Sequence, residues 1–173
     1  MVPILTQDSL DFISHSGSQT ERIGLRLAQL CQPGDVICLE GPLGAGKTCL
    51  TKGIGRGLDI AEPITSPTFV LIHEHRVPGS GMRLFHIDLY RLEEAASSRA
   101  EALGLGLDEY LYGDGVCVIE WPERARELLP PEHLWITLGH IDENKRRVCI
   151  KAIGPRYQQM ISQLRKSAFG LES

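Results

Sequence analysis

The decapeptide GPLGAGKTCL, residues 41–50, carries three glycines, a lysine and a threonine at a spacing that suits phosphate chemistry. Its first eight residues match the pattern GxxxxGK[ST]. Glycine reaches backbone angles that other residues avoid, so consecutive main-chain N–H groups can turn inward around an anion. Residues 41–48 are therefore predicted to form a phosphate-binding loop.

Each part of this loop is expected to make its own contact with a nucleotide. The main-chain groups expected around the β-phosphate belong to Gly41, Gly44, Ala45 and Gly46. Lys47, also a catalytic candidate, is expected to reach the β- and γ-phosphates. The Thr48 hydroxyl is expected to ligate Mg²⁺, and Cys49 to offer its main-chain N–H near the α-phosphate. A glycine-rich connector that binds nothing is disfavoured, because a buried strand precedes the loop and an apolar-striped helix follows it.

Two acids that end apolar runs are the candidates for hydrolytic chemistry: Asp88 ends LFHID, and Glu120 ends VCVIE. Phosphoryl transfer needs Mg²⁺ beside the phosphates and a group that orients or deprotonates the attacking nucleophile. Strand ends converge in an open parallel sheet, so both carboxylates are expected near Thr48. The alternatives are a turn or helix-capping acid at Asp88 and an exposed strand end at Glu120.

The segment TSPT, residues 65–68, supplies the hydroxyls of Thr65, Ser66 and Thr68. Such a loop senses the γ-phosphate and metal in nucleotide switches, and a simple turn explains the same residues equally well.

Histidines alternate along two strand-like segments, at His73, His75 and His86. A third ligand at suitable spacing is missing, so packed or solvated histidines are favoured over a metal site and no structural zinc is expected.

Hydrophobic periodicity predicts alternating helices and strands. Ser18 and Glu21 predict a capping box for a helix that ends at Pro33-Gly34. Buried strands are predicted at 35–40 and 116–122, helices directly after the loop and at 92–105, 123–129 and 157–169, and hairpins that join 69–77 to 82–92 and 134–141 to 146–153. This alternation indicates an α/β domain with a mainly parallel sheet and antiparallel additions. The 173 residues suit one domain, residues 1–173, with about 155–173 as a peripheral helix and tail.

Composition narrows the class of protein. The formal net charge is −4 and no basic stripe is visible, so contact with nucleic acid is expected only through a partner protein. Five widely spaced cysteines indicate reduced thiols. No leader or membrane-spanning run is recognised, so a cytoplasmic protein with no membrane contact is expected.

Four motifs resemble the TsaE family, formerly YjeE, over about residues 16–150: GPLGAGKT, SPTF (66–69), HIDLYRL (86–92) and IEWPE (119–123). The resemblance implies a P-loop NTPase fold with three α/β/α layers, and ATP as the nucleotide. It implies a Mg²⁺ site that uses Thr48 and Glu120, with Asp88 as the water-orienting residue or base.

The same resemblance implies further nucleotide contacts. The stretch from Gly17 to Thr20 would approach the adenine and ribose, TSPT would be a mobile switch, and Trp121 matches the family tryptophan after the metal-linked acid. Cys49 departs from the Thr or Ser common after GKT, which puts only a side-chain contact with the α-phosphate in doubt.

Members of this family are ATPases required for the threonylcarbamoyladenosine modification of tRNA, and they act with the partners TsaB and TsaD. The resemblance therefore implies weak, partner-dependent ATP hydrolysis and only indirect contact with tRNA. The main alternative is a small-molecule or nucleoside kinase, although no arginine-rich lid segment follows the candidate base. A nucleotide-binding module without turnover is also open, whereas a GTPase is disfavoured because NKxD is absent.

Overall fold

The computed structural model describes residues 4–66, 71–92 and 104–170, and eight described strands form one sheet with the order β1-β2-β8-β7-β3-β6-β5-β4. The strands are β1 (Ile4–Thr6), β2 (Ser9–Ser14), β3 (Val36–Glu40), β4 (Ile72–Arg76), β5 (Arg83–Asp88), β6 (Val116–Glu120), β7 (His133–His140) and β8 (Arg146–Ile153). Strands β7, β3, β6 and β5 are parallel to one another, and the other neighbours pair antiparallel. The predicted α/β class, with a parallel centre and antiparallel additions, is confirmed.

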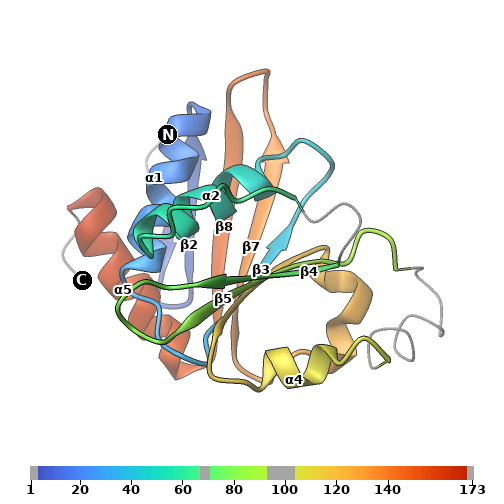
Figure 1. Ribbon diagram of the computed structural model, residues 1–173. Helices are drawn as coiled ribbons and strands as arrows, with labels where there is room; N and C mark the ends of the chain where they lie inside the picture. Colours follow the sequence, from blue (N-terminus) through green and yellow to red (C-terminus); the bar gives the residue numbers. More distant parts are fainter. Residues whose placement is uncertain (1–3, 67–70, 93–103, 171–173) are drawn as a thin grey trace.

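Helices lie on both faces of this sheet (Figure 1). The described helices are α1 (Gly17–Ala28), α2 (Lys47–Gly57), α4 (Leu107–Leu111), the 3₁₀ helix η1 (Pro122–Leu128) and α5 (Pro155–Phe169). Residues of α1, α2 and α5 pack in one core on one face, while α4 and η1 contribute to a second core on the opposite face. The three α/β/α layers are therefore present.

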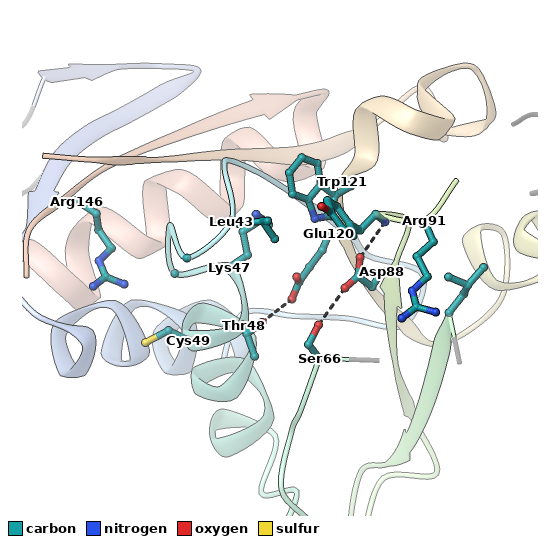
Figure 2. Close-up of a pocket in the computed structure, with 14 residues that line it drawn as sticks. Leu43, Lys47, Thr48, Cys49, Ser66, Asp88, Arg91, Glu120, Trp121 and Arg146 are labelled. Atoms are coloured by element: carbon teal, nitrogen blue, oxygen red, sulfur yellow. Dashed lines mark hydrogen bonds between the residues drawn. The ribbon is translucent and has the colours of Figure 1, made fainter. Parts of the chain in front are cut away.

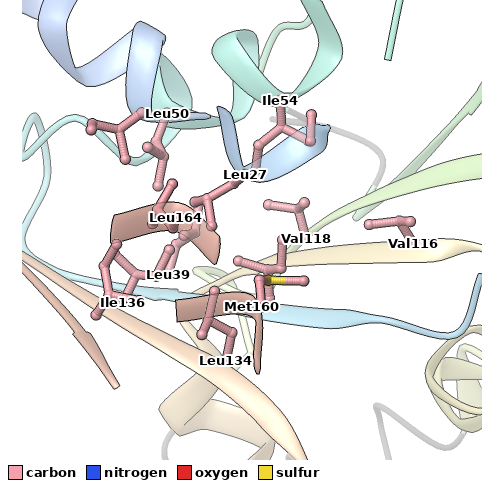
Figure 3. Packing of buried hydrophobic residues seen from close by; sticks show 14 of the residues in the cluster. Leu27, Leu39, Leu50, Ile54, Val116, Val118, Leu134, Ile136, Met160 and Leu164 are labelled. Carbon is pink, nitrogen blue, oxygen red and sulfur yellow. The ribbon is translucent and has the colours of Figure 1, made fainter. Parts of the chain in front are cut away.

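Strand β3 shows how the sequence builds both cores. Ile37 and Leu39 belong to the core under α1 and α2, whereas Val36 and Cys38 belong to the core on the α4 side. Successive side chains of a strand point to opposite faces, so a run of four apolar residues is buried on both sides. Figure 3 shows Leu39 among side chains of α1, α2, α5 and neighbouring strands. This burial holds the end of β3, where the loop begins.

The capping box of α1 lies two residues earlier than predicted. Ser16, not Ser18, is the N-cap: its hydroxyl accepts the main-chain N–H of Gln19 at 3.1 Å. The Gln19 side chain accepts the N–H of His15 at 2.7 Å. The prediction of Ser18 with Glu21 is wrong because the same spacing occurs at Ser16, directly after β2, where the chain first leaves the sheet.

Several segments differ from the expectations or fall outside them. Strands β1 and β2 were not predicted, and β2 extends the sheet beyond β8. The segment after β6 is a 3₁₀ helix with a kink at Ala125. Most of the helix expected at 92–105 lies outside the described residues. Helix α5, expected at the periphery, buries Met160 and Leu164 completely.

Within the described ranges, no helix is both long and apolar enough to cross a membrane.

Candidate functional site

The glycine-rich loop joins the end of β3 to the start of α2. Gly46 has φ 108° and is the N-cap of α2, a conformation that residues with a Cβ rarely adopt. A Cβ on Gly41 would overlap with the main-chain oxygen of Leu138, so the loop packs closely against β7. Both glycines are therefore required by the local backbone, and the loop ends at a helix N-terminus, which favours anions.

The Lys47 side chain is folded across this loop. Its Nζ atom donates to the carbonyl oxygen of Pro42 at 2.9 Å and to that of Gly41. It also lies 4.3 Å from the centroid of the Trp121 ring. Burial lowers the pKa of Lys47, while Glu120 and Asp88 act in the opposite direction. The loop thus holds a buried cation, a suitable partner for an anionic ligand.

The two candidate acids lie side by side at adjacent strand ends. Asp88 of β5 is the register partner of Glu120 of β6. Oε1 of Glu120 accepts the Thr48 hydroxyl at 3.2 Å and lies 3.0 Å from Nε2 of His86. Glu120 is 3% exposed and His86 is fully buried. A carboxylate and a loop hydroxyl therefore meet where the parallel strands end.

Asp88 contacts the segment that contains the TSPT motif. Its Oδ2 accepts the Ser66 hydroxyl at 3.0 Å, and its Oδ1 accepts the main-chain N–H of Tyr90 at 2.9 Å. The second contact is the turn role that the sequence left open, so this carboxylate both stabilises a turn and faces the cavity. Thr65 is exposed and does not line the cavity, and Thr68 lies outside the described residues.

A cavity of about 480 Å³ connects these groups. Its walls come from the loop, the first turn of α2, the ends of β5 and β6, and the start of β8 (Figure 2). The lining residues are Leu43, Gly44, Gly46, Lys47, Thr48, Cys49, Ser66, Leu71, Asp88, Tyr90, Arg91, Glu120, Trp121 and Arg146. The cavity thus brings together both predicted acids, much of the loop, Ser66 and Trp121.

Trp121 takes an unusual backbone conformation beside the cavity. Its φ of 60° and ψ of 47° are left-handed, and it is the N-cap of η1. The Tyr90 ring lies 5.0 Å away, centroid to centroid, and the Arg124 guanidinium 5.8 Å from the Trp121 ring. Left-handed angles are costly for a residue with a large side chain. The turn directs the Trp121 ring over Lys47.

The predicted adenine region, residues 17–20, does not line the cavity, although Gly17 contacts a residue that does. Cys49 lines the cavity, and its thiol donates to the main-chain oxygen of Gly17 at 3.2 Å. Thr20 is fully buried, where its hydroxyl bonds Ser14 at 2.8 Å and the main-chain oxygen of Ser16 at 3.1 Å. The structure therefore places Gly17 beside Cys49 and does not bring Thr20 to the cavity.

Sequence reasoning missed several residues of the site. Arg146 lines the cavity from β8, and its only sequence signal was the basic run NKRR. Tyr90 and Arg91 follow Asp88 directly, inside the HIDLYRL motif. His86 points to the same face of β5 as Asp88, two residues away, because side chains alternate along a strand. That spacing was the signal that could have linked His86 to the acids.

The side-chain oxygens at this site suit Mg²⁺, which also takes phosphate oxygens as ligands, rather than a metal ion held by protein side chains alone. In the described part of the chain, no group of three or more His, Cys, Asp or Glu side chains is arranged to hold a metal ion. Thr48 and Glu120 offer two hard oxygen donors beside the glycine-rich loop. Mg²⁺ is commonly held by one or two such protein ligands together with phosphate oxygens.

Comparisons with known proteins point to one family. The model of the family described as "Threonylcarbamoyl adenosine biosynthesis protein TsaE" matches residues 14–148. A TsaE protein of Bacillus subtilis (strain 168) is 40% identical over 146 residues, which cover 84% of this chain and 87% of that protein. A TsaE protein of Treponema pallidum (strain Nichols) is 39% identical over 138 residues, covering 80% and 97%.

Comparison with solved structures finds the same overall fold in another protein. The "Crystal structure of Bacillus subtilus YdiB" superposes with a TM-score of 0.76 at 34% sequence identity. The match covers 91% of this chain and 95% of that one.

Proposed function

The chain belongs to the TsaE family of threonylcarbamoyladenosine biosynthesis proteins, and from this premise we propose that it binds ATP with Mg²⁺ and hydrolyses it. The hydrolysis would serve the modification of tRNA. The observation that carries this proposal is the contact between the Thr48 hydroxyl and Oε1 of Glu120 at the rim of the loop. A connector without a ligand would need neither a buried lysine nor a strand-end carboxylate in contact with the loop.

The loop residues would bind the triphosphate. Main-chain N–H groups at the start of α2 favour the phosphate charge, and Lys47 would exchange the carbonyl oxygens of Gly41 and Pro42 for phosphate oxygens. Thr48 and Glu120 would hold Mg²⁺. When bound, this ion would supply positive charge that stabilises the phosphate oxygens during transfer.

Asp88 would orient the attacking water. Each of its oxygens already accepts one hydrogen bond, from Ser66 or from the Tyr90 N–H, which fixes the plane of the carboxylate. A carboxylate oxygen can accept a second bond, so a water in the cavity can donate to Asp88. This arrangement supports Asp88 as the residue that holds the nucleophile.

We further propose that the activity depends on the partner proteins TsaB and TsaD, in the cytoplasm. The chain would touch tRNA only through that complex. The net charge of −4 and the lack of a basic stripe in the sequence support indirect contact with nucleic acid.

The test is ATP turnover by the purified chain, with and without TsaB and TsaD. We expect weak hydrolysis alone and clear stimulation by the two proteins. A parallel screen of nucleosides and other small phosphate acceptors addresses the kinase alternative. Phosphorylation of an acceptor without stimulation by the proteins would contradict the proposed function.

A further inference from the structure

Arg146 lies against the phosphate-binding loop from a distant part of the chain. It is the first residue of β8 and is the register partner of Ser14 in β2 and of His140 in β7. Its guanidinium covers Gly46 so closely that a Cβ on Gly46 would overlap with Nη1 of Arg146. The bare α-carbon of Gly46 therefore leaves room for this guanidinium at the loop.

The cavity has chemically different ends. Glu120 and Asp88 lie at one end, whereas Arg146 and Cys49 lie on the opposite side of the loop (Figure 2). Carboxylates at the first end suit a metal ion and a water. The second end offers a positive charge and the first turn of α2, which suit phosphate oxygens directly.

The Arg146 guanidinium has no hydrogen bond or ion pair with any other described residue, although the side chain is half-buried. The neighbouring Arg147 donates from Nε to Asp11 at 2.9 Å, and Arg156 donates to Asp35 at 2.7 Å. Arginine forms strong, directional bonds with phosphate and carboxylate groups. An arginine without a carboxylate partner, placed over an anion-binding loop, favours an anionic ligand.

We propose that Arg146 binds the α- and β-phosphates of the nucleotide, from the side of the loop opposite Glu120. The assignment rests on the proposed function, because it concerns the same nucleotide. The main-chain N–H of Cys49 is expected at the α-phosphate, and Cys49 shares the Arg146 end of the cavity. The γ-phosphate would extend towards Thr48 and Glu120, away from the guanidinium.

The experiment measures nucleotide affinity by calorimetry for Arg146→Ala and for the matched control Arg147→Ala. Both changes remove one positive charge from adjacent residues, but Arg147 is paired with Asp11 on the other face of β8. We expect Arg146→Ala to weaken ADP binding about 10-fold to 100-fold, the range of a lost charge-assisted hydrogen bond. Arg147→Ala is expected to change the affinity less than about twofold, because Arg147 does not line the cavity.

Two further ligands locate the contact. Arg146→Ala is expected to weaken binding of a non-hydrolysable ATP analogue by the same factor as binding of ADP, since Arg146 does not contact the γ-phosphate. The affinity of Arg146→Ala for GDP is expected to be lower than that of the wild-type chain by the same factor, since the contact is with phosphate and not with the base. Arg146→Gln, neutral and of similar length, repeats the measurement if Arg146→Ala unfolds more easily.

Four results would overturn this assignment. These are equal affinities in the Arg146 and Arg147 variants, a loss confined to the ATP analogue, a loss confined to ADP with GDP unaffected, and an Arg146→Gln variant that binds like the wild type. If the wild-type chain bound neither ADP nor the analogue, the proposed function would fail and this assignment with it. Normal ADP binding by the wild type separates the two failures.

Discussion

Nε2 of His86 lies 3.0 Å from Oε1 of Glu120, and both side chains are buried. The Thr48 hydroxyl approaches the same oxygen at 3.2 Å. Since a carboxylate accepts hydrogen bonds, the pattern assigns the imidazole proton to Nε2, and Nδ1 of His86 has no partner among the described residues. Glu120 lines the cavity, and its Oε2 makes no hydrogen bond within the described chain. His86 thus fixes the orientation of the proposed metal ligand.

Removal of the His86 imidazole is expected to weaken the effect of Mg²⁺ on nucleotide binding. Partners of a metal ligand typically influence metal affinity by about 10-fold to 100-fold. We expect His86→Leu to reduce the gain in affinity that Mg²⁺ brings, with affinity in EDTA unchanged. Calorimetry with and without Mg²⁺ measures this, and His73→Leu, the register partner on β4, is the control. Equal Mg²⁺ dependence in both variants would show that His86 does not position Glu120.

Lys47→Ala is expected to weaken ATP binding by at least about 10-fold, because a charge-assisted contact with phosphate is lost from a buried site. Lys52→Ala removes the same charge from an exposed position on the same helix. We expect that control to bind nearly as the wild type does. Binding of a non-hydrolysable ATP analogue by calorimetry distinguishes the two variants. Unchanged affinity in Lys47→Ala would argue against the loop as the nucleotide site.

Asp88→Asn is expected to retain nucleotide binding and to lose most hydrolysis. The amide keeps the shape: its oxygen can accept the Tyr90 N–H and its NH2 group can donate to the Ser66 hydroxyl oxygen, but it cannot take a proton from water. A general base typically contributes about 100-fold or more to the rate. Turnover with TsaB and TsaD present is the measurement, and Asp114→Asn, an exposed acid before β6, is the control. Normal turnover in Asp88→Asn would remove Asp88 from the mechanism.

Gly53→Ala is expected to destabilise the fold at the packing of α1 against α2. A Cβ at Gly53 would overlap with the main-chain oxygen of Glu21. Alanine favours a helix by about 1 kcal/mol over glycine, but overpacking costs about 1–3 kcal/mol, and rigid main chain cannot move aside. Urea denaturation is expected to show a lower free energy of unfolding. Gly139→Ala, with nothing within 4 Å of the added Cβ, is the control; an equal effect of both changes would contradict the close approach of the helices.

The Asp11 and Arg147 pair is expected to make a pH-dependent contribution to stability. The hydrogen bond from Arg147 is the largest influence and lowers the pKa of Asp11, while burial opposes it. An interaction that lowers the pKa of a carboxyl group in the folded state stabilises the protein at pH values above the unfolded-state pKa of about 3.9. This contribution disappears as the pH falls through the folded-state pKa. We expect the stability difference between wild type and Asp11→Asn to shrink on acidification. Urea denaturation across that range tests it, and a constant difference would contradict the pair.

Much of the site was predictable where local sequence sets local structure. The spacing of Gly41, Gly46, Lys47 and Thr48 predicts a tight turn between a strand and a helix, and the structure contains that turn. Asp88 and Glu120 were expected at the ends of separate strands that converge on Thr48, and the structure makes those two strands parallel neighbours. The start of α1 was misplaced because two capping patterns lie two residues apart, and only the end of β2 selects between them.

The sequence by itself determined the strand, the glycine-rich loop and the helix that follows it, because glycine conformation and hydrophobic alternation act over a few residues. Only the tertiary structure decided that Arg146 covers Gly46 and that His86 holds Glu120. Those contacts join residues 34 or more positions apart. They depend on the order and register of strands in the sheet, which is set by packing across the whole domain.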